Sequence, residues 1–593
     1  MSESLREQQM AEAEELLGDR LAKIGFARAL YFGHFLGDKL LPHPDIHADT
    51  EGNAVLEELS IFCEKKIDPV AIDRTSRIPD EVIEGLGRMR ILGACLPKST
   101  GGLGMSQTQY CRLVERLAGH CGSTSLFVNA HHSIGPRAIV LFGNEEQQKQ
   151  WLPKLATGEW ISAFALTEPE AGSDAGNVQT IATPSEDGTG YRLNGQKRWI
   201  TNGGIAQALT VMARTPVEGS DKTKVTAFLV SPDMPGFEVV EERMDKCGVR
   251  GTATGRLAFH DMFVPRENVL GDLGKGLKIA LTVLDYGRTT FGASCTGAAK
   301  FCVERAIKHC NTRVQFQQSL GNFELVKQKL AYMKAGTFAM ESATYQTAAL
   351  MDSGDGDYMV ETAMLKVFAT EVVWEIINDT IQLFGGKGYF TDEPFERMMR
   401  DARINTIGEG ANDVLKVFIA AVGMRDVGMD LQGVLQALPS LKSPFGNVST
   451  LSRFAKRKLG SLVVSPHVPV KSALLTDDAA KLGGIVGKLG SNVERLLRKY
   501  QEDIVDSQYH LRRIADVATE IYVSASVLKR LDFLLTGSNG EAGAREEALL
   551  TGRYYLRTAR RRMQQNLHDL WSNDDQETTT LADQILAADR NNQ

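Results

Sequence analysis

The stretch Ile161-Ser-Ala-Phe-Ala-Leu166 marks the place where the hydrophobic pattern of the chain changes from a helical period to that of strands. Before it, from about 52 to 160, apolar residues recur at three- and four-residue spacing, which is typical of helices. After it come three more short β-rich runs separated by turns, namely Ala208-Leu-Thr-Val-Met212, Val225-Thr-Ala-Phe-Leu-Val230 and Arg256-Leu-Ala-Phe259. Because no helical pattern separates these runs, they predict a small antiparallel barrel or sandwich rather than a doubly wound sheet.

Helical patterns return at Gly276 and continue to about 424, with a break at Gly385-Gly386. A looser stretch follows, and then a last helical region. The predicted fold class is therefore α+β and mostly α. We expect the following parts: an N-terminal extension (1–54), a helical domain (55–160), a middle antiparallel β-barrel (161–275), a helical bundle (276–424), a linker (425–475) and an extra helical domain (476–593).

Composition narrows the function classes. The chain has 593 residues, enough for three or four domains, and a formal net charge of −7, which argues against a general nucleic-acid binder. Its eight cysteines form no C-x-x-C pair, so a reducing compartment fits better than a disulfide framework. The first residues are polar and acidic, unlike a secretion signal or a transit peptide, and no run of ~20 apolar residues occurs. We expect a cytoplasmic bacterial protein.

Two polar segments at strand ends are candidates for binding a ligand. In Phe164-Ala-Leu-Thr-Glu-Pro-Glu-Ala-Gly-Ser-Asp174, Thr167 and Ser173 offer hydroxyl donors to a cofactor or a phosphate. An ordinary loop with Asx turns is the alternative. In the second segment, 194–204, Trp199 and Thr201 stand two residues apart and suit a planar ring; a core tryptophan is the alternative there.

Other patterns argue against nucleotide and metal sites. The segments Gly271–Gly276 and Gly385–Gly388 lack the G-x-G-x-x-G spacing and the Lys-Ser/Thr ending of a phosphate loop. The pair His131-His132 has no acidic partner nearby, and adjacent residues on a helix point apart, so we expect no metal.

Glu409 lies between Gly408 and Gly410 at the start of an apolar helical run. Glycines allow a ligand to approach the backbone closely, and a dry carboxylate there would be a general base with a pKa raised from ~4.3 toward neutrality. The alternative is a first-turn acid favoured by the helix dipole.

Taken in order, these segments resemble the acyl-CoA dehydrogenase family over residues 55–424. The resemblance rests on four motifs: Leu-Thr-Glu-Pro-x-Ala-Gly-Ser-Asp (166–174), Asn-Gly-x-Lys-x-Trp-Ile-Thr-Asn-Gly-Gly (194–204), Arg313-Val-Gln-Phe316, and Glu409-Gly. The helical extension, joined through Ser443 to Asn447, is similar to the very-long-chain branch.

The resemblance implies α,β-dehydrogenation of acyl-CoA thioesters in fatty acid β-oxidation, with FAD as cofactor, Glu409 as base and an electron-transfer flavoprotein as acceptor. It also implies a homodimer, because part of the cofactor site reaches the FAD of the neighbouring subunit. The implied cofactor-binding residues are Phe164, Leu166, Thr167, Ser173, Trp199, Ile200, Thr201, Arg313, Phe316, Gln382, Leu383, Phe384, Gly385, Gly386, Ala411 and Asp413. The implied substrate residues are Ser173, Asp285, Arg288 and Gly410.

The sequence departs from the family pattern near the base. Gly408 replaces an aromatic residue, and Ala411 replaces a threonine. Some relatives carry their base just before the arginine of the preceding helix, where this chain has Gly287, so Glu409 is the only candidate. Ala130, small and in the stretch that ends the fatty pocket in relatives, predicts room for a long chain.

Two other functions fit the same fold: a non-enzymatic assembly or scaffold protein, and an acyl-CoA oxidase that uses oxygen directly. A further alternative concerns residues 451–464, where four basic residues mix with apolar ones. This segment predicts either peripheral association with the inner face of an anionic membrane or a helix with a solvated basic side.

Overall fold

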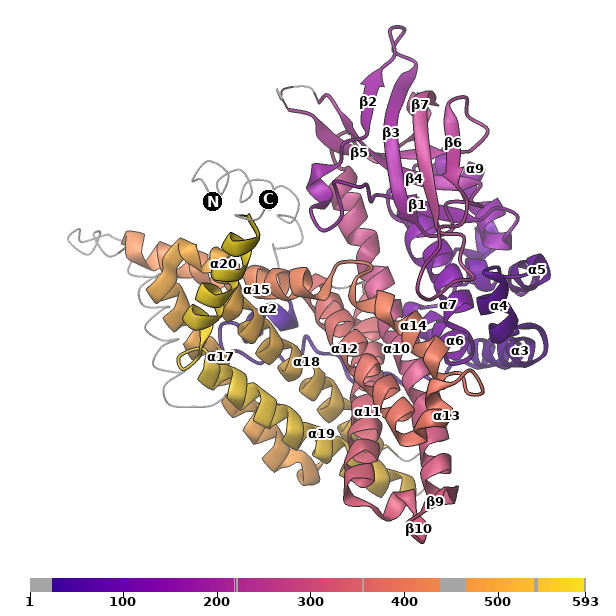
Figure 1. The fold of residues 1–593 in the computed structure, drawn as a ribbon. Helices are drawn as coiled ribbons and strands as arrows, with labels where there is room; N and C mark the ends of the chain where they lie inside the picture. Colours follow the sequence, from indigo (N-terminus) through magenta and orange to yellow (C-terminus); the bar gives the residue numbers. More distant parts are fainter. Residues whose placement is uncertain are drawn as a thin grey trace. The chain divides into compact units, whose positions relative to one another are not determined.

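The computed structural model describes residues 24–217, 219, 222–354, 357–437, 466–537 and 542–590. They form two compact units (Figure 1). The first unit contains residues 43–412, and the second contains residues 24–42 together with the chain from residue 413 onward. In the part of the chain that is described, no helix combines the length and apolar character needed to cross a membrane.

The first unit begins with a helical layer, and its helix starts are set by polar caps. The Asp49 side chain accepts from the N–H of Gly52, and Asn144 and Gln147 form a capping box. The apolar faces of α3 to α7 form one buried core, whereas those of α8 and α9 pack with the sheet in a second one. The helices are α3 (Thr50–Lys66), α4 (Pro69–Thr75), α5 (Asp80–Arg88), α6 (Gln107–His120), α7 (Gly122–Asn129), the π-helix η3 (Ala130–Ile134), α8 (Gly135–Phe142) and α9 (Glu145–Thr157).

The sheet follows, and it is mixed rather than antiparallel. Its strand order is β6-β7-β3-β2-β4-β5-β8, and β1 pairs with β4 off this path. Both β1 and β2 run parallel to β4, which corrects the expected antiparallel arrangement, and the open strand order does not show a closed barrel. The strands are β1 (Ser162–Ala165), β2 (Ile181–Pro184), β3 (Gly190–Ile200), β4 (Ala208–Thr215), β5 (Lys224–Val230), β6 (Phe237–Glu241), β7 (Gly255–Pro265) and β8 (Val269–Leu270).

The burial of β1 explains the parallel pairing. All four of its residues are buried, as is usual for a strand covered on both faces, whereas alternating burial is typical of an antiparallel strand with one wet face. The long connection through residues 166–180 then leads into β2, which pairs with β4 at Arg214, further along the same edge as β1, because β5 occupies the other edge.

A second helical layer completes the first unit. The long α10 (Gly276–Thr312) packs against α6, α11 and α12. A short hairpin after α10 lies at the end of the unit opposite the sheet (Figure 1). Its strands are β9 (Val314–Gln315) and β10 (Gln318–Ser319), and they precede α11 (Glu324–Asp352), α12 (Met359–Phe384), α13 (Gly386–Tyr389), α14 (Phe395–Arg403) and the 3-10 turn η7 (Ile404–Thr406).

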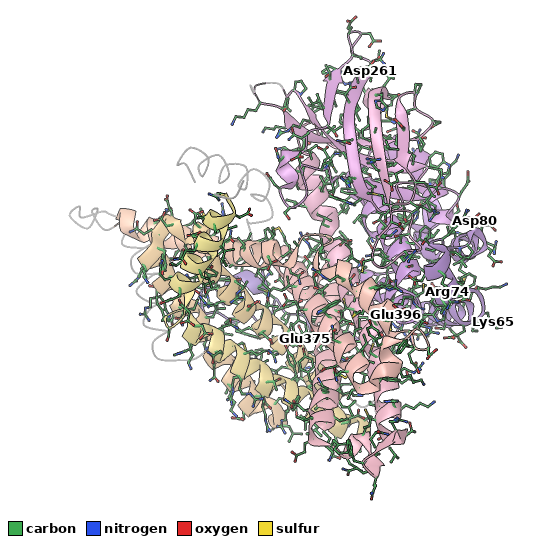
Figure 2. The ribbon with its side chains drawn as sticks, viewed as in Figure 1. Lys65, Arg74, Asp80, Asp261, Glu375 and Glu396 are labelled. Carbon is green, nitrogen blue, oxygen red and sulfur yellow. The ribbon has the colours of Figure 1, made fainter. Side chains whose placement is uncertain are left out.

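The surface of the first unit carries charges of both signs. The side chains labelled in Figure 2 include Lys65, Arg74 and Asp80 in the α3–α5 region and Asp261 at the tip of the sheet. Interspersed charge of this kind is ordinary for a protein surface.

The second unit is helical. Its early segment is fixed by a buried ion pair between Arg28 and Asp426, and by the Tyr31 hydroxyl, which donates to the carbonyl of Ile419 at 2.9 Å. The helices are α2 (Phe26–Leu30), α15 (Asn412–Ala437), α17 (Thr476–Tyr500), α18 (Gln508–Thr536), α19 (Ala542–Asp569) and α20 (Asp575–Arg590). The segments 443–447 and 451–464 lie outside the described residues.

Candidate active site

Glu409 lies in the turn between η7 and α15 and has a left-handed backbone, with φ of 56°. This conformation is unfavourable for a residue with a side chain and is typical of functional positions. Gly410 also has a positive φ, of 101°. A turn of this shape directs the Glu409 carboxylate back toward α10 rather than along its own helix.

Gly287 of α10 provides the space for that carboxylate. A Cβ atom at Gly287 would lie 2.2 Å from Oε2 and 2.7 Å from Oε1 of Glu409, which no real contact permits. Gly287 therefore does more than leave the alternative base position empty: its missing side chain is what allows Glu409 to occupy the site.

Two cations hold the backbone around Glu409. The Arg288 guanidinium donates to the carbonyl of Glu409 at 3.4 Å and to Asp285 at 3.3 Å. Lys366 Nζ donates to the carbonyl of Gly410 at 2.7 Å and to Asn412 Oδ1 at 2.9 Å. These bonds fix the turn without a direct hydrogen bond to the Glu409 carboxylate.

The Glu409 carboxylate is consequently shielded from water, and its pKa lies near neutral pH. Burial raises the pKa of Glu409 to about 7, although Arg288 and Lys366 pull the pKa in the opposite direction. Within the described residues, neither Oε2 nor the backbone N–H of Glu409 has a hydrogen-bond partner, and Oε2 is buried. A polar atom left in this state is costly unless a ligand uses it.

A second buried carboxylate, Glu168, joins the two candidate ligand segments. Lys197 Nζ lies 2.6 Å from Glu168 Oε1, with both side chains buried, and it also donates to the carbonyl of Leu166 at 3.1 Å. Burial raises the pKa of Glu168, but the Lys197 ammonium and the hydrogen bonds from Thr180 and Gln179 together outweigh burial and hold that pKa below its usual value. The N–H of Arg198 donates to the carbonyl of Thr167 at 3.0 Å, so the loop lies directly against the end of β3.

Sequence reasoning missed Glu168 and Lys197. The available signal was a lysine in the middle of a predicted strand, because a buried lysine requires a partner of opposite charge.

The predicted cofactor residues in the two segments that the Glu168–Lys197 ion pair connects differ in exposure to solvent. Trp199 has a left-handed backbone and is 52% exposed, so its ring is not a core residue. Thr167 and Thr201 are partly exposed, and Ser173 is exposed. Phe164 and Ile200, in contrast, are buried in hydrophobic clusters of the unit.

Other predicted cofactor residues lie in the hairpin and helices that follow the sheet in sequence. Phe316, at the turn of the β9–β10 hairpin, is 88% exposed with φ of 50°. Gly385 and Gly386 have no atom within 4 Å of where a Cβ would stand, and Gly385 has φ of 61°. Figure 1 shows this hairpin and the sheet at opposite ends of the unit, so one chain does not bring the two sets together.

The remaining candidates take up different positions. Arg313 caps α10 and is exposed, and Gln382, near the end of α12, is exposed too. Leu383 and Phe384 are buried, with the Phe384 ring stacked on His309 at 4.0 Å. Ala411 is partly buried beside Gly410, and Asp413 is an exposed residue that begins the second unit.

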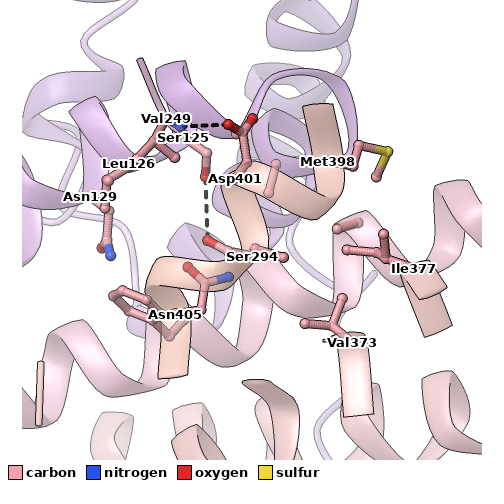
Figure 3. A pocket seen from close by; sticks show the side chains of 15 residues that line it. Ser125, Leu126, Asn129, Val249, Ser294, Val373, Ile377, Met398, Asp401 and Asn405 are labelled. Carbon is pink, nitrogen blue, oxygen red and sulfur yellow. Dashed lines mark hydrogen bonds between the residues drawn. The ribbon is translucent and has the colours of Figure 1, made fainter. Parts of the chain in front are cut away.

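A pocket of about 580 Å³, counted up to its open mouth, lies between α7, α10, α12 and α14 (Figure 3). Phe291, Ser294 and Ala298 of α10 line it, and Gly287 precedes them at the same helical spacing, so one face of α10 leads from Glu409 along the pocket. Asn129, rather than Ala130, lines the pocket, while Asp401 accepts from the N–H of Val249 at its edge. The other lining residues are Ala118, Gly122, Ser125, Leu126, Val373, Ile377, Met398, Ala402 and Asn405.

The adjacent histidines have structural partners. His131 Nδ1 accepts from the N–H of Ser162 at 3.0 Å, and His132 Nε2 accepts from the N–H of Cys95 at 3.2 Å. Burial lowers the pKa of His131 to about 4, and it lowers the pKa of His132 too. Over the described ranges, no group of three or more histidine, cysteine and acidic residues is placed to hold a metal ion.

Comparison with protein families matches the chain in four consecutive parts. Three match the acyl-CoA dehydrogenase N-terminal domain (49–159), middle domain (163–262) and C-terminal domain (274–424). The fourth, residues 473–591, matches the C-terminal domain described as ACAD9/ACADV.

Individual relatives extend over nearly the whole chain. The chain is 35% identical to the mitochondrial very long-chain specific acyl-CoA dehydrogenase of Macaca fascicularis, over 95% of this chain and 85% of that protein. It is 32% identical to the probable acyl-CoA dehydrogenase FadE10 of Mycobacterium tuberculosis, over 98% and 91%. A solved acyl-CoA dehydrogenase from Bacillus anthracis, complexed with FAD, superposes with a TM-score of 0.79 at 28% identity, covering 95% of this chain and 94% of the other. The chain belongs to the acyl-CoA dehydrogenase family.

Proposed function

We propose that this FAD-dependent acyl-CoA dehydrogenase oxidises long-chain acyl-CoA thioesters to trans-2-enoyl-CoA, with Glu409 as the general base. The enzyme class and the cofactor follow from the family. The observation that carries the role of Glu409 is its dry carboxylate against Gly287, with a buried Oε2 that has no partner in the described part of the chain.

The chemistry requires a base of intermediate strength. The proton on the carbon next to a thioester carbonyl is weakly acidic, so its acceptor must be ionised near neutral pH and still basic enough to hold a proton. A carboxyl group with a pKa of about 7 meets both conditions, whereas an ordinary exposed glutamate is a weaker base.

The backbone N–H of Glu409 supports proton removal by binding the thioester oxygen. It has no acceptor among the described residues, and the left-handed turn holds it beside the carboxylate. A donor aimed at the oxygen that gains negative charge lowers the barrier to enolate formation. Arg288 and Lys366 keep the turn in this shape through the carbonyls of Glu409 and Gly410.

The residues present fit FAD. Trp199 offers a half-exposed ring beside the Thr167 loop, and the open space at Gly385 and Gly386 allows a ligand to approach the backbone. When bound, FAD accepts the hydride from the β-carbon. The protein's part is to hold the substrate between the bound flavin and Glu409 and to keep water out of the site.

We further propose a homodimer in which each cofactor site takes residues from both chains. The support is that Trp199, at the end of β3, and Phe316, on the β9–β10 hairpin, belong to separate parts of one unit, both unusually exposed for aromatic residues. An electron-transfer flavoprotein is the proposed acceptor. Association with the inner face of a membrane stays a prediction, because residues 451–464 lie outside the described residues.

Anaerobic titration of the purified flavoprotein with acyl-CoAs of increasing length tests the proposal. We expect stoichiometric bleaching of the flavin absorbance, formation of 2-enoyl-CoA, and reoxidation by an electron-transfer flavoprotein but not by oxygen. Protein without flavin that no added FAD restores would support a scaffold role, and peroxide release during turnover would support an oxidase. Either result would overturn the proposal.

A further inference from the structure

The pocket beyond Glu409 contains polar groups that dehydrogenation itself does not use. Ser125 and Asn129 stand one turn apart on the pocket face of α7, and Ser294 faces them from α10 (Figure 3). An apolar chain has nothing to offer these side chains. Their hydrogen bonds show which of their donors remain available.

The two serines share a single hydrogen bond. Ser125 Oγ and Ser294 Oγ lie 3.3 Å apart, so one hydroxyl donates to the other, and the second hydroxyl hydrogen has no acceptor among the described residues. A neighbouring hydroxyl on α10 behaves differently: Thr296 donates, at 2.8 Å, to the carbonyl of Gly292 in the preceding turn. The serine pair is therefore directed into the pocket rather than bonded to its own helices.

Asn129 adds a second donor, one helical turn closer to Glu409, because its partner on α10 is Thr290 and not Ser294. Its Oδ1 accepts from Ser133 Oγ at 2.6 Å and also from Thr290 Oγ1, which fixes the orientation of the amide. The amide nitrogen of Asn129 then donates to none of the residues that the structure describes, although the side chain is buried. Two donors thus point into one pocket from one face of α7.

The helix geometry gives their distance from the reacting carbon. Ser294 follows Gly287, which touches the Glu409 carboxylate, by seven residues, or ~10 Å along α10. An extended chain advances ~1.2 Å per bond, so this span corresponds to roughly eight bonds beyond the α-carbon. The serine pair therefore stands level with about the tenth carbon of a bound acyl chain.

We propose that the substrate is an acyl-CoA whose chain carries an oxygen, as a hydroxy or oxo group, near carbon 10, and that Ser125 and Ser294 bind this oxygen. The inference rests on the proposed function and names its substrate class. Apolar residues along the same pocket, among them Leu126, Phe291 and Ile377, contact the methylenes on either side. An unsubstituted chain leaves the donors unpaired and is disfavoured for that reason.

The test compares kcat/KM of the holoenzyme for four CoA thioesters of octadecanoic acid: unsubstituted, 10-hydroxy, 10-oxo and 17-hydroxy. We expect the 10-hydroxy or the 10-oxo substrate, or both, to exceed the unsubstituted one by about tenfold, the value of one or two hydrogen bonds. The better of these two identifies the group. The 17-hydroxy isomer controls for polarity alone, and it should gain nothing.

Two variants test whether the pocket serines cause the preference for 10-oxygenated over unsubstituted acyl-CoA. Ser294→Ala and Ser125→Ala each remove a hydroxyl, and each should reduce the ratio of kcat/KM between the 10-oxygenated and unsubstituted substrates about fivefold. Ser342→Ala is the matched control, because the Ser342 hydroxyl donates to the carbonyl of Phe338 on its own helix and Ser342 does not line the pocket. That variant should keep the wild-type ratio.

Equal kcat/KM for all four thioesters would overturn the inference. So would serine variants that lower the melting temperature but leave the ratio of kcat/KM between the 10-oxygenated and unsubstituted substrates unchanged. The serines would then be helix-packing residues. Such an enzyme would still bleach its flavin with octadecanoyl-CoA, so the proposed function would stand. If none of the four thioesters bleached the flavin, the proposed function would fail first.

Discussion

Glu409 and Glu168 are both withdrawn from water in the first unit, but their surroundings are opposite. Glu168 has a lysine at 2.6 Å and accepts from the hydroxyl and the N–H of Thr180, so its pKa falls. Glu409 has no hydrogen bond to Oε2 in the described structure, and burial raises its pKa to about 7. Burial alone therefore does not decide the direction in which the pKa of a carboxylate shifts; its hydrogen-bond and ion-pair partners do.

The largest expected effect is that of Glu409→Gln. The amide keeps the size of the side chain but accepts no proton, so kcat should fall about 1,000-fold, as expected for loss of a general base. Flavin content and melting temperature should stay near wild type. Stopped-flow measurement of flavin reduction is the readout, and a loss smaller than tenfold would contradict the role of Glu409 as base.

Lys197→Met should act on stability instead of chemistry. It leaves Glu168 as a buried carboxylate without its cation, which costs about 3 kcal/mol of unfolding free energy. The loop at Thr167 should loosen, and the purified protein should contain less FAD. Denaturant unfolding and flavin content measure both effects. Recovery in the double variant Lys197→Met with Glu168→Leu would confirm an ion-pair origin, because no buried charge remains.

Gly287→Ala tests the space that Glu409 needs. The new Cβ would fall 2.2 Å from Oε2, so the carboxylate must move away from its position, and kcat should drop about 100-fold. Gly408→Ala is the control, since its Cβ would meet only the carbonyl of Ile404, at 3.6 Å. If both alanines had equal effects, the loss would come from the turn in general and not from displacement of the base.

The sequence predicted Glu409, the candidate base, better than it predicted the buried Glu168–Lys197 pair. Glu409 between two glycines and the order of helices and strands are local patterns, and both can be read from the chain. The Glu168–Lys197 pair joins residues 29 positions apart across a loop and a strand, so no local pattern reveals it. Parallel pairing of β1 and β2 with β4, and the entry of Asn129 into the pocket instead of Ala130, likewise depend on tertiary packing.

The pH dependence of activity and of stability tests the smallest expected effects of the difference between Glu409 and Glu168. Only the ionised Glu409 accepts a proton, so kcat/KM should rise about tenfold per pH unit in acid and level off above pH ~7. The contribution of Glu409 to the unfolding free energy changes in the opposite direction, because it decreases as pH rises. The folded protein binds this proton more tightly than the unfolded chain, where glutamate titrates near 4.5, so the stabilisation is complete below pH 4.5 and is lost as pH rises through 7.

The unfolding free energy of wild type relative to Glu409→Gln should therefore decrease by up to about 3 kcal/mol between pH 4.5 and 8. Glu168→Gln should show the reverse trend, because a lowered pKa contributes stability that is present above the unfolded pKa and is lost in acid. If the two glutamates gave parallel pH profiles, their difference in partners would not control their protonation. Opposite slopes, measured on one fold in one buffer series, would tie the reactivity of Glu409 to its missing hydrogen bonds.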